Sequence, residues 1–253
     1  MHYVTFRFYA ELNDFLPRKA RQRDMLHEFH GRASVKDRIE ALGVPHPEAE
    51  LIRVNGCPVD FGYRVRDGDR ISVYPHLASV PNPKPLRPPH PRGRFALDQH
   101  LAKLAAYLRL LGQDVVHRAN WADDELARFA AEDSRVLLSR DRRLLMRRSV
   151  VHGGFVHATD PMQQVPEVLH RFGAPETFAP FTRCLACNGL LREAPKNEIA
   201  GRLAPDTRRF YERFWRCPGC DRVFWEGSHV RRMRTWVAAW LAHPDVPRLA
   251  AIP

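Results

Sequence analysis

Four aspartates follow predicted β-strands at positions where their carboxylates could act together. Asp98 directly follows one strand, Asp123 opens the helix after the next with Asp124 beside it, Asp141 lies two residues past a third strand and Asp160 two past a fourth. Functional groups of open α/β sheets collect at the carboxyl ends of the strands. Clustered carboxylates favour a hard cation such as Mg²⁺ or Mn²⁺, which can orient water for attack on a phosphodiester. The pattern therefore predicts a metal-dependent nuclease site.

Each of these aspartates also has a purely structural explanation. Asp98, Asp123 and Asp141 occupy positions where a helix N-cap is expected, and a capping aspartate needs no catalytic role. Asp160 precedes Pro161, a common pair at the start of a helix. Only the joint placement of the four favours catalysis, and the alternative function is a non-catalytic RNA-binding or adaptor protein.

Basic residues dominate the part of the chain that carries these acids. The chain has 40 Lys and Arg against 29 Asp and Glu, a formal charge of +11, and residues 81–253 hold 28 basic and 18 acidic residues. This excess suggests a polyanionic partner such as RNA. Arg140, Arg142 and Arg143 flank Asp141 and are expected to bind the nucleic acid, because guanidinium groups bind phosphates through paired hydrogen bonds.

Four of the five cysteines have the spacing of a metal site. Cys184 and Cys187 form one Cys-x-x-Cys pair, and 29 residues separate it from the second pair, Cys217 and Cys220. Four thiolates fill the tetrahedral shell of Zn²⁺ and leave no open position, so the predicted zinc site is structural. Cys57 is left over and is expected to be a half-buried thiol without a catalytic role.

Three arginines, Arg183, Arg216 and Arg222, lie beside the cysteines. They could offset the negative charge of the thiolates or face RNA, and the sequence leaves both roles open. Nearby aromatic residues are expected mainly to fill the core around the zinc, although aromatic rings can also stack on unpaired bases.

Strands and helices must alternate to position the four aspartates. Short apolar runs predict strands at 94–97, 115–117, 135–139 and 155–158, with helices at 99–111, 123–132, about 141–148 and about 161–172. This alternation predicts an α/β domain with a parallel sheet.

The N-terminal part predicts a separate α+β domain. Residues 3–9 alternate like a strand, and a polar stretch with a possible second strand follows. Ser34 and Gly43 are placed to cap a helix, and three more strands are expected at 51–54, 58–60 and 70–75. This order of elements is that of a β-grasp domain.

Two turns of this domain resemble those of the small ubiquitin-like sulfur carriers. They are Val54-Asn55-Gly56 and Asp67-Gly68-Asp69-Arg70-Ile71. The carriers end in a free Gly-Gly tail, whereas this chain continues past Ser79. We therefore expect a domain that binds a protein partner or acts as a scaffold.

A proline-rich stretch separates the two regions. Residues 81–91 contain six prolines, which favour a stiff, extended connector. Residues 231–253 read as a basic cluster followed by an amphipathic helix. We expect a cytoplasmic protein, because no apolar run approaches the length of a membrane span and the first residues lack a signal-peptide layout.

Several motifs together resemble the Mut7-C ribonuclease domain. They are Phe95-x-x-Asp98, Asp123-x-x-Leu126, Ser139-Arg140-Asp141, Asp160-Pro161-x-x-Gln164, Arg183-Cys184-x-x-Cys187-Asn188 and Cys217-x-x-Cys220-x-x-Val223-x-Trp225. The resemblance implies a PIN-like fold with a Mg²⁺- or Mn²⁺-dependent RNase site at Asp98, Asp123, Asp141 and Asp160. Asp124 could replace Asp123.

A ubiquitin-like domain in front of a Mut7-C domain is itself a known arrangement. The expected order is an α+β β-grasp domain (1–80), a linker (81–92), an α/β PIN-like domain with a parallel sheet (93–178), a Cys₄ zinc ribbon (179–230) and a helical tail (231–253).

Overall fold

The computed structural model describes residues 1–76, 81–173 and 175–242. The chain forms two compact units. One contains Met1–His90 and Ala122–Phe155, and the other contains Pro91–Trp121 and Val156–Pro253. Within the described ranges, no helix combines the length and the apolar character needed to cross a membrane.

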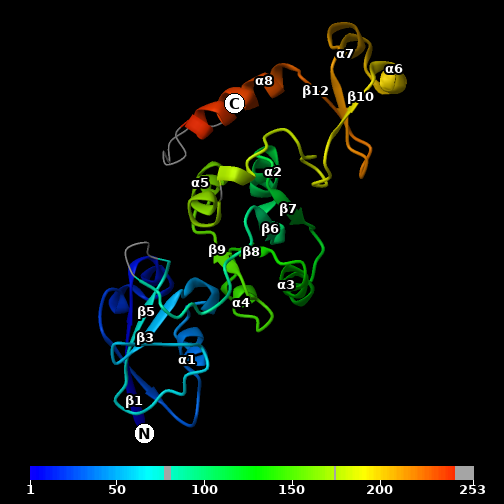
Figure 1. Ribbon diagram of the computed structural model, residues 1–253. Helices are drawn as coiled ribbons and strands as arrows, with labels where there is room; N and C mark the ends of the chain where they lie inside the picture. The colour runs from blue at the N-terminus through cyan, green and yellow to red at the C-terminus, as the bar shows by residue number, and fades with distance from the viewer. Residues whose placement is uncertain (77–80, 174, 243–253) are drawn as a thin grey trace. The chain divides into compact units, whose positions relative to one another are not determined.

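The first unit begins with a five-stranded sheet in the order β2-β1-β5-β3-β4. Figure 1 labels three of its strands, β1, β3 and β5, together with helix α1. Its strands are β1 (His2–Phe8), β2 (Met25–Phe29), β3 (Leu51–Val54), β4 (Cys57–Val59) and β5 (Arg70–Tyr74). β1 and β5 run parallel, and the other neighbours are antiparallel. Helix α1 (Val35–Ala41) shares one buried cluster with β1, which contains Ile39, Phe6 and Phe8. A single helix on one face of a mixed sheet is the predicted β-grasp.

The ends of α1 are set by local residues, as predicted. The Ser34 hydroxyl accepts a hydrogen bond from the Asp37 amide (3.2 Å), and the Asp37 carboxylate accepts one from the Ser34 amide (3.0 Å). This reciprocal pair is a capping box. Gly43 follows the helix with a φ of +93°, a conformation that glycine adopts without steric cost.

The polar stretch after β1 contains the possible second strand. Two 3₁₀ turns, η1 (Ala10–Phe15) and η2 (Arg18–Ala20), lead into β2, which pairs with β1 at the edge of the sheet. Phe29 is the buried residue of β2, whereas Leu26 is 72% exposed. An edge strand with so weak an alternation gives little sequence signal.

The proline-rich linker lies against the β-grasp domain. The Asn82 amide group donates to the Glu50 carbonyl (2.7 Å), and the Arg87 guanidinium donates to the carbonyls of Pro47 (2.6 Å) and His46 (3.2 Å). The first compact unit continues to His90. The predicted boundary at residue 80 falls in 77–80, outside the described residues.

The first unit also contains part of the predicted α/β domain. Its elements are α3 (Asp123–Glu132), β8 (Val136–Ser139), α4 (Arg142–Leu145) and β9 (Gly153–Phe155). β8 is buried throughout and runs parallel to β9. α3 has the predicted bounds, whereas α4 is shorter than the predicted helix at 141–148.

Several polar contacts join this segment to the β-grasp domain. Arg142 Nη1 donates to the Phe15 carbonyl (2.8 Å), and the Phe155 amide donates to the carboxylate of Glu48, which is fully buried in η3 (His46–Glu48). The Arg142 guanidinium also lies over the rings of Phe15 and Phe155, at 5.0 and 5.8 Å from their centroids. The β-grasp domain is therefore packed onto this segment and is not a free module.

The second unit contains the other parallel strand pair. Its first elements are β6 (Arg94–Leu97), η4 (Gln99–Leu101), α2 (Ala102–Leu110), β7 (Asp114–His117) and α5 (Pro161–Phe172). β6 runs parallel to β7, and α2 packs against β7 and α5. The predicted helix at 99–111 is thus a 3₁₀ turn followed by a shorter α-helix. Parallel pairing confirms the predicted α/β class.

The predicted strand at 155–158 is wrong in position. β9 covers residues 153–155, where a Cβ atom on Gly153 would come within 3.0 Å of Leu145, so glycine suits this close contact. Beyond β9, the amides of His157 and Ala158 donate to the Glu167 carboxylate at 2.6 and 2.9 Å. A side chain on α5 therefore binds amides that we expected to lie in a strand.

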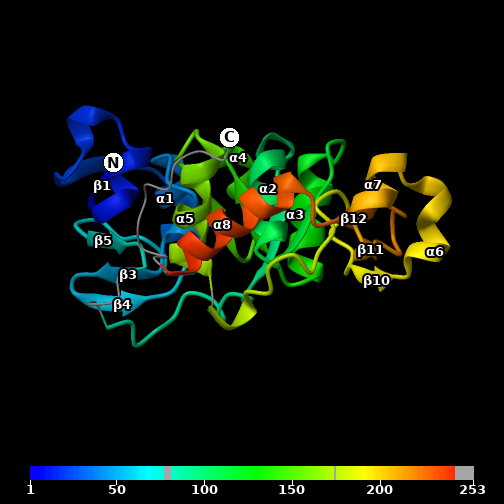
Figure 2. The ribbon, with the colours of Figure 1, turned by 90° about the horizontal axis from the view of Figure 1, so that it is seen from above.

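A three-stranded antiparallel sheet follows η5 (Pro175–Thr177). Its order is β10 (Arg192–Ala194), β11 (Phe214–Arg216) and β12 (Val223–Trp225), with α6 (Lys196–Ile199), η6 (Ala200–Arg202) and α7 (Pro205–Phe210) between β10 and β11 (Figure 2). Helix α8 (Ser228–Ala242) confirms the helical character of the tail. Residues 243–253 of the predicted tail lie outside the described residues.

Replacing Arg142 tests the contact between the β-grasp domain and α4. Arg142→Gln is expected to lower the free energy of unfolding by about 1.5 kcal/mol, because the Phe15 carbonyl loses a charged donor. Urea denaturation measures the change. Arg143→Gln, at the exposed neighbouring position, is the control and should unfold like the wild type. Equal urea midpoints of unfolding for the two variants would contradict the structural role of Arg142.

Candidate metal centre and acidic residues

The four predicted zinc ligands lie together in the second unit. The Sγ atoms of Cys184 and Cys220 are 3.5 Å apart, those of Cys187 and Cys217 are 3.3 Å apart, and all four lie within 4.8 Å of one another. A tetrahedral Zn²⁺ ion with four thiolates needs sulfur separations of about 3.8 Å. The four thiols therefore fit a zinc ion with little movement.

Both Cys-x-x-Cys turns have the same backbone structure. The Asn188 amide donates to the Cys184 carbonyl (2.9 Å), and the Asp221 amide donates to the Cys217 carbonyl (2.8 Å). Each first cysteine in turn donates its own amide to the carbonyl five residues ahead, at 2.8 and 2.9 Å. Asn188 and Asp221 both adopt the left-handed conformation, with φ of 74° and 62°. Two matching turns that present four thiols are typical of a zinc ribbon.

The thiols have different surroundings and therefore different pKa values. Burial raises the pKa of Cys184, and burial together with the neighbouring thiols raises the pKa of Cys187 to about 12. Burial also disfavours the Cys217 thiolate, but hydrogen bonds from the Cys220 amide and the Cys187 thiol outweigh it and lower the Cys217 pKa to about 7. Four adjacent thiols cannot all ionise unless a cation compensates their charge, and Zn²⁺ has the matching chemistry.

Asn188 and Arg109 join the first cysteine turn to the α/β elements. Asn188 Oδ1 accepts from the Val115 amide (2.9 Å), and its Nδ2 donates to the Asp114 carboxylate (2.7 Å). Arg109 of α2 is 4% exposed and donates to the carbonyls of Val115 (3.0 Å) and Leu185 (2.9 Å). Because Leu185 lies between the first two cysteines, this buried guanidinium also favours negative charge on them.

Two of the three arginines beside the cysteines have structural partners. Arg183 donates to the carbonyls of Gly112 and Asn188, both at 3.1 Å. Arg216 pairs with Asp221 and thereby lowers the pKa of that carboxyl. Arg222 is exposed. The structure thus assigns Arg183 and Arg216 to holding the cysteine turns.

Asp98 and Asp160 cap helices in the second unit. Asp98 Oδ1 accepts from the His100 amide (3.1 Å), and Asp160 Oδ1 accepts from the Met162 amide (2.9 Å). Asp98 directly follows β6, as predicted, and is 5% exposed. Asp160 is exposed, and because β9 ends at residue 155, it lies five residues past the strand, where we expected two.

Asp141 caps α4 in the first unit. It lies two residues past β8, as predicted, and its Oδ1 accepts from the Arg143 amide (2.7 Å). Its own amide donates to the Ser139 hydroxyl (2.8 Å), which fixes the turn between strand and helix.

Asp123 does not cap α3, contrary to the expected N-cap. Ala122 is the N-cap residue, and Asp123 is the first residue of the helix. The carboxylates of Asp123 and Asp124 both pair with Arg147, the former at 3.4 Å from Nη2.

The four aspartates are divided between the two units. Asp98 and Asp160 belong to the second, whereas Asp123 and Asp141 belong to the first. Within the described residues, the four cysteines are the one group of potential metal ligands whose ligand atoms meet closely. The joint action of the aspartates stays a prediction.

The three arginines expected to bind nucleic acid have different surroundings. Arg143 is exposed and Arg140 is half-buried. Arg142 binds the Phe15 carbonyl, so its guanidinium already has a structural task. RNA binding by these residues stays a prediction.

Sequence reasoning assigned no structural role to three residues that organise these sites, Arg109, Asn188 and Arg147. The position of Asn188 before a glycine indicates a turn, but nothing local indicates its bonds to β7. Arg109 and Arg147 stand among many arginines without a distinguishing signal.

A β-grasp domain followed by parallel α/β elements and a four-cysteine ribbon defines the class of this protein. The model of the Mut7-C RNAse domain matches residues 93–237, and the model of the Mut7-C ubiquitin domain matches residues 1–80. The chain belongs to the Mut7-C RNAse domain family and carries the ubiquitin-like domain in front, as its motifs indicated.

Comparison with curated proteins gives no match. The crystal structure of H. volcanii small archaeal modifier protein 1 is similar at 18% identity, covering 30% of this chain and 100% of that chain, with a TM-score of 0.26. The β-grasp assignment rests on the order of the strands and on the family match.

Removing one cysteine tests the zinc site. Cys217→Ser is expected to lose zinc to a chelator that leaves the wild type loaded, and to expose the ribbon to protease, because the segment depends on the metal for its fold. Metal analysis and limited proteolysis measure both effects. Cys57→Ser is the matched control, because Cys57 of β4 is exposed, where we expected a half-buried thiol. Full zinc retention by Cys217→Ser would contradict the assignment.

Proposed function

We propose that this chain is a Mg²⁺- or Mn²⁺-dependent ribonuclease that hydrolyses RNA phosphodiester bonds at a PIN-like acidic site. The match to the Mut7-C RNAse domain supports a ribonuclease. The placement of Asp98 and Asp141 just beyond β6 and β8 carries the assignment of the site. The proposed metal ligands are Asp98, Asp123, Asp141 and Asp160.

The capping bonds are compatible with metal binding. Asp98, Asp141 and Asp160 each use Oδ1 to accept a helix amide. Among the described residues, no hydrogen bond or ion pair engages Oδ2 of Asp141 or Asp160. A capped carboxylate has a fixed orientation, and oxygen ligands of this kind are those that Mg²⁺ and Mn²⁺ prefer. Bound there, either ion would activate water and stabilise charge on the phosphate.

Side chains near Asp141 suit a phosphate ligand. Arg143 is exposed next to the cap, and its amide already donates to the Asp141 carboxylate. We assign it, with Arg140, to binding RNA phosphates, because arginine forms paired hydrogen bonds with them. The zinc ribbon has a closed set of four ligands and therefore supports the fold without taking part in hydrolysis.

The β-grasp domain has one sheet face that could receive a protein partner. The opposite face is covered by α1, and η1 and η3 contact the segment that ends in β9. Tyr3 and Leu26, which are 41% and 72% exposed, lie on the other face, where β1 and β2 form its edge. We assign partner binding to this face.

The non-catalytic alternative has one observation in its favour. Three of the four aspartates cap helices, and a cap alone accounts for an aspartate at these positions. Such a protein would bind RNA with a steep salt dependence and would not cleave it in the presence of metal.

Cleavage by an Asp141→Asn variant separates the two functions. The wild type is expected to cleave RNA with Mn²⁺ or Mg²⁺ and to stop with EDTA, and Asp141→Asn is expected to cleave about 100-fold more slowly or worse. Asparagine can still cap α4, so the fold should persist. Rates are measured with labelled single-stranded and structured RNA.

Asp206→Asn is the matched control, since Asp206 is an exposed aspartate in the first turn of α7. It should cleave like the wild type. If wild type and Asp141→Asn bind RNA but are equally inert with both metals, the acids are structural and the binding function is correct.

A further inference from the structure

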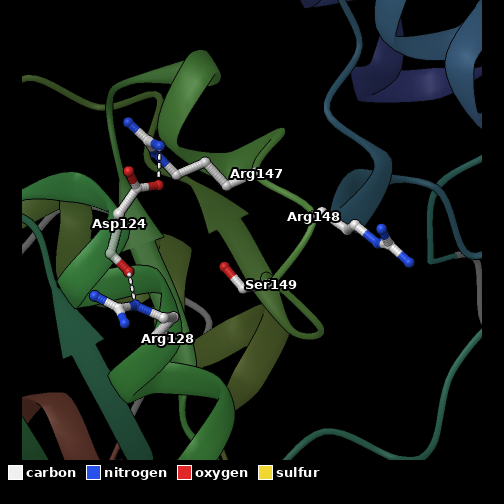
Figure 3. A pocket seen from close by; sticks show the side chains of 5 residues that line it. All are labelled: Asp124, Arg128, Arg147, Arg148 and Ser149. Carbon is white, nitrogen blue, oxygen red and sulfur yellow. Dashed lines mark hydrogen bonds and ion pairs between the residues drawn. The ribbon is translucent and has the colours of Figure 1, made fainter.

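A pocket rich in arginine lies beside the start of α3. It is an open pocket of about 790 Å³ lined by Asp124, Arg128, Arg147, Arg148 and Ser149. Asp124 and Arg128 come from α3, and the other three follow α4, so all five belong to the first unit. Figure 3 shows Asp124 between Arg147 and Arg128.

Asp124 holds two of these arginines in place. Its carboxylate pairs with Arg147 Nη1, and its carbonyl accepts a hydrogen bond from Arg128 Nε at 3.3 Å. Asp123 adds a longer contact to Arg147 Nη2, at 3.4 Å. Arg147 is only 34% exposed, and its Nε is buried without a hydrogen-bond partner among the described residues. The arginines are therefore oriented in advance, which reduces the entropic cost of binding a ligand.

The charges of the pocket favour an anion. Arg128 and Arg148 are exposed and form no ion pair among the described residues, whereas Arg147 is paired with Asp123 and Asp124. Two guanidinium groups are thus unpaired within the described ranges, and Arg147, which has five N–H donors, can bind a ligand in addition to the two carboxylates. Guanidinium matches phosphate in shape and charge. None of the described residues that line the pocket is aromatic, so the chemistry fits the sugar-phosphate backbone better than a stacked base.

We propose that Arg128, Arg147 and Arg148 bind the phosphates of RNA, and that the carboxylate of Asp124 makes this residue a positioning residue for Arg147. The proposal rests on RNA being the substrate, as argued above. The proposal gives different roles to two neighbouring aspartates. Asp123 makes the longer contact with Arg147 and keeps the proposed role of metal ligand, whereas Asp124 acts by orienting Arg147.

Removing the Asp124 carboxylate gives an unusual test. General electrostatics predicts that loss of a negative charge tightens binding to RNA. If the Asp124 carboxylate positions Arg147, Asp124→Ala should instead weaken binding about fivefold and reduce the slope of log Kd against log salt by about 0.7 for each phosphate that Arg147 no longer binds. Binding of a labelled oligouridine is measured by fluorescence anisotropy in EDTA, so cleavage plays no part.

Glu125→Ala is the matched control, because Glu125 is the next residue of α3, is exposed and carries the same charge. It should bind as tightly as the wild type or more tightly. Asp124→Glu should recover part of the affinity. Arg148→Gln, at an exposed position where the fold should be insensitive, should weaken binding and reduce the salt slope in the same way.

Unchanged or tighter binding by Asp124→Ala, with Arg148→Gln also unaffected, would overturn the proposal. Loss of cleavage by Asp124→Ala without any change of binding in EDTA would also overturn it, since Asp124 would then act as a metal ligand. Because affinity in EDTA is independent of catalysis, failure of the ribonuclease proposal would show only in the cleavage assay.

Discussion

The first amide groups of a helix need hydrogen-bond acceptors. At three of the turns that lead from a strand into a helix, an aspartate carboxylate is the acceptor, and these carboxylates fix where the helices begin. Asp98, Asp141 and Asp160 bind the amides at the start of η4, α4 and α5. A capped carboxylate is fixed in direction by one oxygen and can offer the other to a ligand. In Asp141 and Asp160, among the described residues, the second oxygen makes no hydrogen bond or ion pair, so capping by these two side chains would not compete with the proposed metal binding.

The cysteine ribbon meets a different constraint. Its three short strands enclose a small cluster of Ala194, Ile199 and Phe214, too few buried residues for an independent core. Four thiols with the geometry of a zinc site compensate for this. Asn188 and Arg109 then tie the first cysteine turn to β7 and α2 through part-buried hydrogen bonds, so a metal bound by the four thiols would also secure the contact between the ribbon and the α/β elements.

Local signals made much of this structure predictable. Ser34 with Asp37, Asp160 with Pro161 and the two Cys-x-x-Cys turns each act within a few residues, and the structure has the α1 cap, the α5 cap and the cysteine cluster where we expected them. β9 could not be placed in this way, because distant Glu167 binds the amides beyond it. The pairing of Arg147 with Asp123 and Asp124 likewise joins residues 23 and 24 positions apart, a separation at which sequence patterns carry no information.

The most direct test of the account is the binding of Mn²⁺ to the intact protein, measured by electron paramagnetic resonance with zinc left in the ribbon. Asp98→Asn preserves the cap but removes a ligand charge, and Asp206→Asn removes an exposed charge elsewhere. We expect Mn²⁺ binding by the wild type and by Asp206→Asn, and much weaker binding by Asp98→Asn. Equal binding by all three proteins, or none by the wild type, would contradict the claim that the capping aspartates form a metal site.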